Sequence, residues 1–428
     1  PAEWGERVLI PARITRETTW SGLLQALAGG STLLLAPGLP FGWVVDTARY
    51  RQRSVQRPLT ERSVHGPEDT FNEVVLSQMN QLRQRLADPA LRFRSLKLGR
   101  WQHTRVAVAY LEGVANPALV ETVAARLGGL DLAGHANATQ IAGLIRDHPR
   151  SIFPTIRSTE RVDIAVQRLL EGKVVILVDG DPFVLIAPAP LADFYRTAMD
   201  YADSWADTTV TRAIRLAGWA MAVYLPALFV ALTQVNPDLL APPLYMLTAG
   251  AFLGLAIPPI WQVLFGILTL EVLREAALRL PQPLSTTIGI LGAIVVGTAV
   301  VKAAYTSPQV IVIMTLATLA FFSAPLYELT APWRLVGLGL LLAAALLGML
   351  GLVLATMVFI AVLTGMRSFG TPYFEPWAPF RWQDWKDVLW RVPWADYRTR
   401  LSAARPLQRV TGNRPRTQPV HLRRGRQR

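Results

Sequence analysis

Residues Gln167–Phe183 read QRLLEGKVVILVDGDPF, and our interpretation of the N-terminal half starts from this stretch. A shift of 142 positions brings it onto Gln25–Phe41, QALAGGSTLLLAPGLPF, without a gap and with seven identical residues. Each copy predicts the end of a helix, a glycine after it, a buried strand, a glycine-containing turn and a second strand. The second strand falls at Trp43–Asp46 in one copy and at Val184–Pro188 in the other. We therefore predict an α/β N-terminal region made of two related subdomains.

The same stretch contains no convincing catalytic motif. Asp179-Gly180-Asp181 could hold a metal or a phosphate, but Asp-Gly between two apolar runs is typical of a β-hairpin turn. Gly172-Lys173 lacks the earlier glycine and the following Ser or Thr of a phosphate loop. The chain has no cysteine and only five scattered histidines. We therefore predict no enzyme activity, no cofactor and no metal site.

Outside the repeat, apolar and basic residues are segregated along the chain. Hydrophobic residues make up 51% of the 428 positions and charged residues 17%, yet the formal net charge is +13. Most of that excess lies after residue 365. The repeat and this distribution together predict four regions: a first α/β subdomain (1–64), a helix with the second α/β subdomain (65–205), a transmembrane domain (206–365) and a basic tail (366–428). Because the chain opens at Pro1 rather than Met, we expect the first region to be incomplete at its N-terminus. The helix of the second region is expected over Pro67–Leu86.

Five apolar stretches lie in the third region, and each has at least about the 17 residues that a membrane-spanning helix needs. They are Ala213–Leu232, Leu244–Leu268, Leu284–Val301, Gln309–Leu329 and Leu335–Gly365. Two adjacent prolines, Pro258 and Pro259, remove two backbone donors from the second stretch and predict a broken or re-entrant helix. If both ends of the chain are cytoplasmic, the number of crossings must be even. We therefore predict an α-helical polytopic domain of four spans and one broken segment, with the last stretch as the clearest span.

Charged residues within this region are the candidate gating residues. Glu271, Arg274 and Glu275 lie in the leucine-rich segment LEVLREAALRL. That segment is either an amphipathic helix at the membrane surface or a helix lining a pore. Lys302 is either an interfacial anchor or a determinant of charge selectivity. Together with Pro258 and Pro259, these four residues form the predicted pore or gating set.

The tail carries ten arginines and no acidic residue after Asp396. A basic segment directly after membrane spans marks the cytoplasmic side, and it can also bind anionic lipid. We prefer these interpretations to nucleic-acid binding.

Taken in order, several motifs resemble one family, the A subunits of GerA-type spore germination receptors and the related SpoVAF proteins. The motifs that carry the resemblance are VAYLEGVANP (Val108–Pro117), IFPTIRSTERVD (Ile152–Asp163), LLEGKVVILVDGDPFVLIAP (Leu169–Pro188), EVLREAALRLP (Glu271–Pro281) and RSFGTPYFEPWAPF (Arg367–Phe380).

The resemblance implies a protein of the spore inner membrane whose N-terminal domain and C-terminal tail are cytoplasmic. It also implies a homo-oligomer, a pentameric ring with an ion path, that works with a transporter-like B subunit and a lipoprotein C subunit. A SpoVAF-like auxiliary channel and a non-conducting scaffold are the alternatives. Family members usually have acidic residues near the positions of Gln262, Ile267 and Lys302, so the missing carboxylates would change the field that a permeating cation meets.

Overall fold

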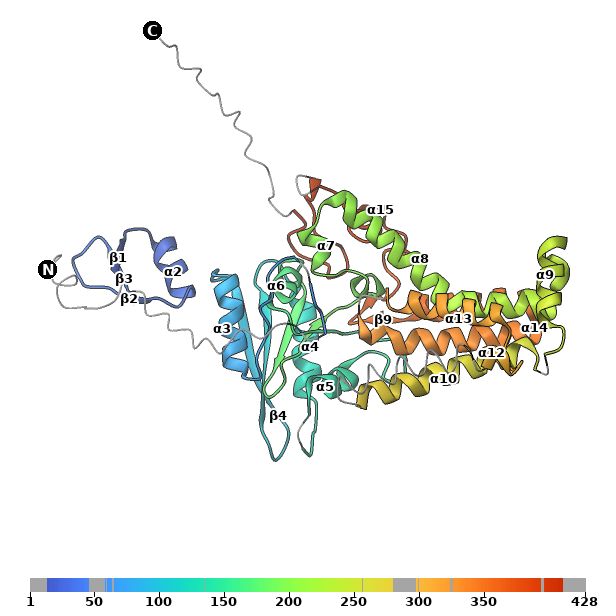
Figure 1. Ribbon diagram of the computed structural model, residues 1–428. Helices are drawn as coiled ribbons and strands as arrows, with labels where there is room; N and C mark the ends of the chain where they lie inside the picture. The colour runs from blue at the N-terminus through green and yellow to red at the C-terminus, as the bar shows by residue number, and fades with distance from the viewer. Residues whose placement is uncertain are drawn as a thin grey trace, which may run out of the picture.

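The computed structural model describes residues 14–45, 58–255, 257–279, 298–323, 326–393 and 396–410, apart from residues 59, 64, 135 and 299. Two β-sheets lie at one end of the molecule, and a group of long helices extends away from them at the other end (Figure 1). The arrangement agrees with the prediction of an α/β N-terminal region followed by a helical region.

The larger sheet has five strands, all antiparallel to their neighbours. In order across the sheet they are β4 (Leu91–Leu98), β5 (Thr104–Leu111), β7 (Val174–Val178), β8 (Val184–Ala187) and β6 (Arg157–Thr159). The central strands are apolar on both faces, as Val174–Val178 shows with all five residues buried. A strand of this kind requires cover on both sides.

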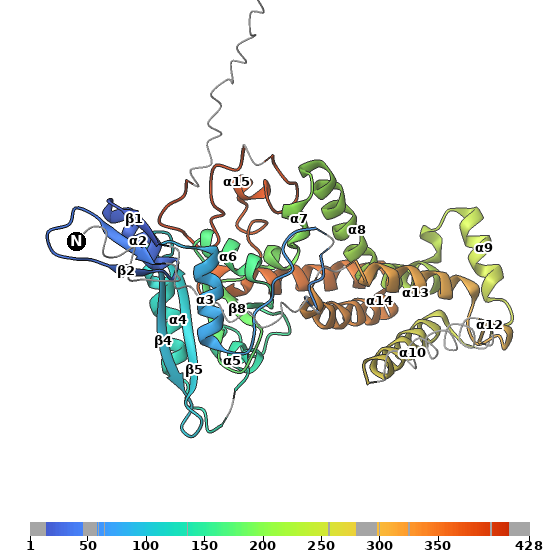
Figure 2. The same ribbon diagram turned by 60° about the vertical axis from the view of Figure 1, so that its left-hand side comes forward.

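Helices provide that cover on each face of the sheet (Figure 2). Val106 and Val108 pack with α4 and α5 on one face, and Ala107 and Ala109 pack with α3 and α6 on the other. The bounds of these helices are α3 Val75–Arg85, α4 Pro117–Gly128, α5 Ala138–Ile145 and α6 Val162–Leu170. The domain is therefore a three-layer α/β/α unit. Helix α3 begins eight residues later than we predicted.

The predicted repeat is confirmed by strand pairing. The first unit consists of β1 (Ile14–Glu17), α2 (Trp20–Ala28), β2 (Thr32–Leu34) and β3 (Gly42–Val45). Adding 142 to the bounds of α2 gives those of α6. The same shift converts the pair Leu34–Trp43 into Ile176–Leu185, and it converts the β1–β3 register into the β6–β8 register. Both units are therefore one β-α-β-β fold with one register.

The turn Asp179-Gly180-Asp181 joins β7 to β8 as a hairpin, as predicted. Gly180 has a φ of +89°, a conformation that favours glycine. The two carboxylates have a structural use, because Oδ1 of Asp179 accepts from the backbone N–H of Val75 and Oδ2 of Asp181 accepts from that of Ala138. Each aspartate thus caps the first turn of a helix on one face of the sheet.

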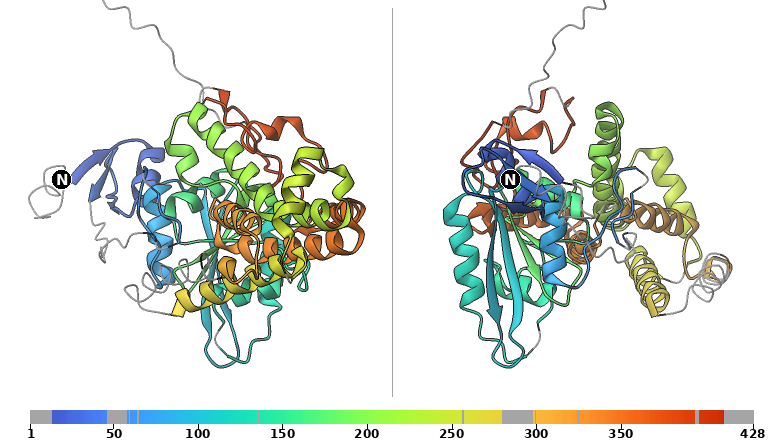
Figure 3. Two further views of the ribbon diagram at one scale, coloured as in Figure 1. Left: turned by 45° about the vertical axis from the view of Figure 1, so that its right-hand side comes forward. Right: turned by 90° about the vertical axis from the view of Figure 1, so that its left-hand side faces the viewer.

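The helical region begins with α8 (Trp205–Val230), which continues through a π-helical turn to Val235. The other helices are α9 Pro242–Phe252, α10 Pro259–Arg279, α12 Val300–Lys302, α13 Pro308–Phe321 and α14 Thr330–Gly365. Within the described residues, two stretches are long and apolar enough to cross a membrane, Trp205–Val235 and Thr330–Gly365. Helix α13 is apolar but shorter. Figure 3 shows these helices from two further directions.

Helix α14 is not the single span that we predicted. Its 36 residues would form a straight rod of about 54 Å. However, Gly348 has a non-helical φ of +63°, and the ring centroids of Trp333 and Phe359 are only 5.4 Å apart. A Cβ placed on Gly351 would overlap the carbonyl oxygen of Ala343. The chain therefore reverses at Gly348, and its two halves lie side by side.

A side chain from another helix stabilises this reversal. Oδ1 of Asn236, just beyond the end of α8, accepts a hydrogen bond of 2.8 Å from the backbone N–H of Met349. Hydropathy could not reveal the turn, because both halves are equally apolar.

The remaining apolar stretches behave differently from one another. The stretch around Pro258-Pro259 is broken, since α9 ends at Phe252 and α10 begins at Pro259. The described part of the charged segment, Leu270–Arg279, is the last part of α10 rather than a separate surface helix. Leu284–Val301 lies almost entirely outside the described residues.

Much of the predicted tail is folded. Short strands β9 (Arg367–Ser368) and β10 (Thr371–Pro372) form a hairpin, and helix α15 (Trp382–Trp385) follows. The Oγ of Ser368 accepts from the backbone N–H of Ala189. The backbone N–H of Leu407 donates to the carbonyl of Val114 at 2.9 Å. The chain up to residue 410 therefore returns to the α/β domain.

Candidate functional site

The predicted gating residues fall at two ends of the helical region. Pro258 and Pro259 lie at the end far from the sheets, where Gln234 Oε1 accepts from the backbone N–H of Ile260 at 3.1 Å. Lys302 is exposed and precedes Ser307, whose backbone N–H donates to Oε1 of Gln262 at 2.8 Å. Gln262 is buried and also donates from Nε2 to the carbonyl of Ile257. The side-chain amide of Gln262 thus holds the broken helix to the start of α13.

The charged residues of α10 lie at the opposite end of that helix. Oε2 of Glu271 accepts from Nη1 of Arg274 at 2.8 Å, and Oε1 forms a short ion pair with Arg334 of α14. Glu275 is exposed one turn further along α10. The structure therefore brings Glu271 and Arg274 together and separates them from Lys302.

A larger set of charges, which sequence reasoning missed, lies where the helices meet the α/β domain. We call it the junction cluster. It contains six basic and four acidic side chains, each at most 10% exposed. They are Arg168, Glu171, Lys173, Asp193, Arg196, Asp200, Arg212, Arg215, Asp387 and Arg391. Three distant segments supply them: the end of α6 with the start of β7, the link into α8 together with the first turns of α8, and the segment after α15.

Asp387 is the centre of this cluster. Its side chain is fully buried, and it accepts from Arg196 at 3.1 Å, from Arg391 at 3.0 Å and from Arg212 at 3.3 Å. The hydroxyl of Tyr201 donates to it at 2.9 Å. One carboxylate therefore binds side chains from before, within and after the helical region.

The other carboxylates also join separate segments. Oε1 of Glu171, in the α/β domain, accepts from Arg168 at 2.6 Å and from Arg196 at 3.0 Å. Asp200 accepts from Arg212 at 2.9 Å and from Arg215 at 3.1 Å. A buried charge that loses its partner costs about 3–5 kcal/mol. Separating any one segment from the others would incur that cost, so the three segments are held together.

Arg212 and Arg215 lie at the start of the first apolar stretch, where basic residues commonly anchor a span at the lipid surface. Both are buried instead, because Asp200 and Asp387 occupy their guanidinium groups.

Burial and neighbouring charges shift the pKa values of two groups in the cluster. Burial alone would raise the pKa of Asp387, but Arg196, Arg212 and Arg391 outweigh it and lower that pKa. Burial lowers the pKa of Lys173 to about 8, although Asp193 and Glu171 oppose the change. Lys173, whose Gly-Lys pair lacks the other residues of a phosphate loop, forms a short buried ion pair with Asp193.

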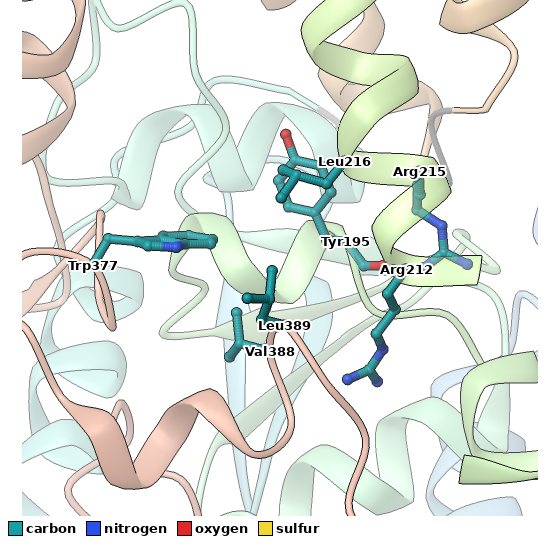
Figure 4. A pocket seen from close by; sticks show the side chains of 7 residues that line it. All are labelled: Tyr195, Arg212, Arg215, Leu216, Trp377, Val388 and Leu389. Atoms are coloured by element: carbon teal, nitrogen blue, oxygen red, sulfur yellow. Dashed lines mark hydrogen bonds between the residues drawn. The ribbon is translucent and has the colours of Figure 1, made fainter. Parts of the chain in front are cut away.

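A small pocket lies beside the cluster, lined by Tyr195, Arg212, Arg215, Leu216, Trp377, Val388 and Leu389 (Figure 4). The guanidinium groups of the two arginines point away from Trp377, toward their carboxylate partners. The rest of the lining is apolar apart from the tyrosine hydroxyl and the indole N–H of Trp377. The charges of the two arginines are therefore balanced by carboxylates rather than directed into the pocket.

A second contact joins the α/β domain to the turn before α14. Oε1 of Glu328 accepts from the backbone N–H of Ser158 in β6 at 3.2 Å and also from the Ser158 hydroxyl. Burial raises the pKa of Glu328, against the opposing effects of the Ser158 hydrogen bond and the charge of Arg157. Both ends of α14 thus reach the same domain, since β9 follows its last residue.

Nothing in the described residues forms a group of three metal-binding side chains. The geometry at the junction holds segments together and offers no open reactive group.

Comparisons with known proteins agree with the motifs. The family model described as Bacillus/Clostridium GerA spore germination protein matches residues 2–403. Spore germination protein GerLA of Bacillus cereus is 34% identical over 91% of this chain and 79% of its own length. Spore germination protein B1 of Bacillus subtilis (strain 168) is 35% identical over 88% of this chain and 78% of its own.

Stage V sporulation protein AF of Bacillus subtilis (strain 168) is 31% identical over 95% of this chain and 82% of its own length. Among solved structures, the N-terminal domain of the A subunit of the Bacillus megaterium spore germinant receptor GerK3 covers 43% of this chain and 66% of its own. That alignment has 31% identity and a TM-score of 0.32.

Proposed function

This chain belongs to the GerA family of spore germination proteins, and we propose that it is the A subunit of a germinant receptor, a membrane subunit that couples germinant sensing to ion release. It is not an enzyme in this proposal. The relatives include spore germination proteins GerLA and B1 and stage V sporulation protein AF at similar identity.

The junction cluster is the observation that carries the proposal. A coupling subunit needs a contact through which a movement of its soluble domain reaches its membrane helices. Asp387 meets that need, because it binds Arg196 before α8 and Arg212 within α8, and Arg196 also binds Glu171 of the α/β domain. If one segment moves away from the junction cluster, buried charges in the other segments lose their partners. A movement of all three segments together is therefore more favourable than a movement of one segment alone.

The helices cross the spore inner membrane, with the α/β domain and the C-terminal segment both cytoplasmic. Hydropathy suggested four spans and one broken segment. The reversal at Gly348 adds one crossing. Because the two ends lie on one side, the total must stay even, so α10 crosses as well and six crossings result. Contacts of α10 with Gln234 at one end and Arg334 at the other support this count.

The working assembly is a homo-oligomer, a pentameric ring, with a transporter-like B subunit and a lipoprotein C subunit. Anionic lipid binds the basic residues after 396, and nucleic acid is not a partner. In this assembly Pro258, Pro259 and Lys302 lie near one mouth of the ion path, and Glu271, Arg274 and Glu275 lie near the other.

Two other roles compete with this one. A SpoVAF-like auxiliary channel would amplify germination without a germinant-binding partner. A non-conducting scaffold would anchor a partner through the α/β domain, and the missing carboxylates at Gln262, Ile267 and Lys302 favour it.

Spores that lack every other GerA-type receptor and carry only this chain with candidate B and C subunits test the proposal. We expect release of monovalent cations on exposure to a panel of amino acids, and no release when this chain alone is omitted. Normal amounts of all three subunits with no release under any germinant would contradict the receptor role. Release that requires another receptor would assign the auxiliary role.

The mass of the purified protein in detergent, measured by light scattering corrected for bound detergent, tests the ring. A closed ring is expected because a path between copies needs one. A stable monomer would exclude a homomeric pore and leave the scaffold.

A further inference from the structure

Four aromatic side chains after the helical region form a patch that the proposed function does not use. The ring centroids of Trp382 and Trp385 are 6.0 Å apart, those of Trp382 and Trp390 are 5.3 Å apart, and those of Phe380 and Trp385 are 5.5 Å apart. Phe380 and Trp382 are each 63% exposed. We call these four residues the aromatic patch. Exposed rings gathered at one place indicate an interaction surface.

The patch is rigidly held from behind. Asp384 of α15 is buried, and its carboxylate accepts from the backbone N–H of Ser402 at 3.2 Å and from the Ser402 hydroxyl. Asp387 is buried in the junction cluster. The segment therefore presents its outer rings from a fixed backbone.

The patch lies beside the start of α8. The backbone N–H of Arg391 donates to Oγ1 of Thr209 in α8 at 3.0 Å. Val388 and Leu389 line the pocket with Leu216, which is also on α8 (Figure 4). The patch thus lies within about two helical turns of the point where α8 becomes wholly apolar.

An apolar face of α8 continues from the same level. Val210, Ile214 and Met221 are spaced by four and seven residues, and they are 58%, 62% and 40% exposed. Residues at these spacings share one face of a helix. Trp205, at the first residue of α8, is 54% exposed as well. The surface next to the patch is therefore one that lipid would cover if α8 spans a membrane.

We propose that the aromatic patch lies in the headgroup region of the lipid bilayer, on the side of the α/β domain, and anchors the junction cluster at the membrane surface. The proposal rests on the proposed membrane location of the helices and is independent of the receptor role. Tryptophan suits this place because its apolar ring and its N–H group prefer different solvents. The segment from 366 to 428 carries ten more basic than acidic residues, which favours an anionic headgroup layer.

A second copy of the chain is the competing occupant, and the size of the patch argues against it. A stable protein interface buries about 800 Å² on each partner. Two exposed rings of about 200 Å² each fall well short of that area.

The chain contains no cysteine, so single cysteines can be labelled without background. The experiment uses the full chain with Trp382→Cys, labelled with a nitroxide and reconstituted in vesicles of phosphatidylethanolamine and phosphatidylglycerol. Accessibility to molecular oxygen, which partitions into lipid, is compared with accessibility to a water-soluble nickel chelate. Trp101→Cys is the aqueous control, because Trp101 is 83% exposed in the turn between β4 and β5. Leu342→Cys, on an exposed position of α14, is the membrane control.

We expect an oxygen-to-nickel ratio at position 382 several-fold above that at 101 and below that at 342. A ratio equal to that at 101 would overturn the proposal, provided that 342 reports lipid. Dipolar broadening between labels at 382 would also overturn it, by placing a second copy there. If 342 itself reports water, the membrane location of the helices fails as well. Phe380→Cys repeats the test in case Trp382→Cys does not fold.

Discussion

Nη1 of Arg212 donates a 2.7 Å hydrogen bond to the backbone carbonyl of Asp387, across 175 residues of chain. The first helix of the helical region is thereby tied to the segment that follows the last one. The same aspartate binds Arg196 and Arg391 through its side chain. One buried aspartate therefore joins the segments before, within and after the helical region.

Asp387→Asn tests this link. An asparagine side chain has nearly the same shape as aspartate and leaves the backbone carbonyl in place. It removes the negative charge that balances the guanidinium groups of Arg196, Arg212 and Arg391. We expect a loss of about 3–5 kcal/mol in the free energy of unfolding. Thermal unfolding of the detergent-solubilised protein measures it. Asp396→Asn is the control, because Asp396 is exposed, and it should change stability by less than about 0.5 kcal/mol. Equal effects of the two substitutions would contradict the central role of Asp387.

Glu328 predicts a pH dependence of stability. Its pKa is raised in the folded protein, so the folded state holds the proton at pH values where the unfolded state has released it. Stability is therefore expected to fall as the pH rises from the ordinary carboxyl range through the raised pKa. Charged groups that face Glu328 are Arg157, which opposes the shift, and Glu61, which adds to it.

Glu328→Gln should remove this pH dependence and keep the hydrogen bonds from Ser158. Stability profiles of the two proteins between pH 4 and pH 8, the range that spans a carboxyl titration, make the comparison. Glu121→Gln, at a carboxylate that is 69% exposed, is the control. Parallel profiles for the original protein and Glu328→Gln would show that Glu328 does not titrate in this way.

Gly348→Ala tests the reversal of α14. The left-handed φ opposes any side chain, and a Cβ would overlap Oδ1 of Asn236. We expect a loss of about 1–3 kcal/mol or more, measured by thermal unfolding in detergent. Gly339→Ala lies in the same helix with open space around its Cβ, so it should be neutral or stabilising by up to about 1 kcal/mol. A tolerated alanine at 348 would favour a straight helix.

Lys302→Glu tests the proposed ion path. If Lys302 faces that path, reversing its charge in every copy should raise cation flux into vesicles that contain the purified protein. Lys302→Gln should give an intermediate flux. Absence of flux in all three proteins, at equal amounts of reconstituted oligomer, would favour the non-conducting scaffold.

The fold was predictable where local pattern dominates. Seven identities at one offset predicted the repeated unit, and Pro258-Pro259 predicted the break before α10. The turn at Gly348 was not predictable, because several glycines lie in that apolar stretch and only Asn236, a hundred residues earlier, selects one of them.

The junction cluster was also not predictable from the sequence. Arg212 and Arg215 have the pattern of lipid-facing anchors, and the sequence gives no sign that Asp200 and Asp387 reach them. Three local spacings were visible, i,i+4 for Asp387 and Arg391 and i,i+3 for Arg168 with Glu171 and for Asp193 with Arg196. Such spacings are common on solvated helices. Ion pairs between distant segments depend on the tertiary fold.

The two β-α-β-β units place the same fold in two different environments within one polypeptide. Position for position, the same backbone occurs twice, with Leu34 39% exposed in one copy and its counterpart Ile176 fully buried in the other. In the described part of the chain, β2 ends its sheet, whereas β7 is flanked by β5. A substitution made at both members of such a pair holds geometry constant and varies only the surroundings. The exposed unit can thus serve as the reference when the contribution of burial to the stability of a strand is measured in the other unit.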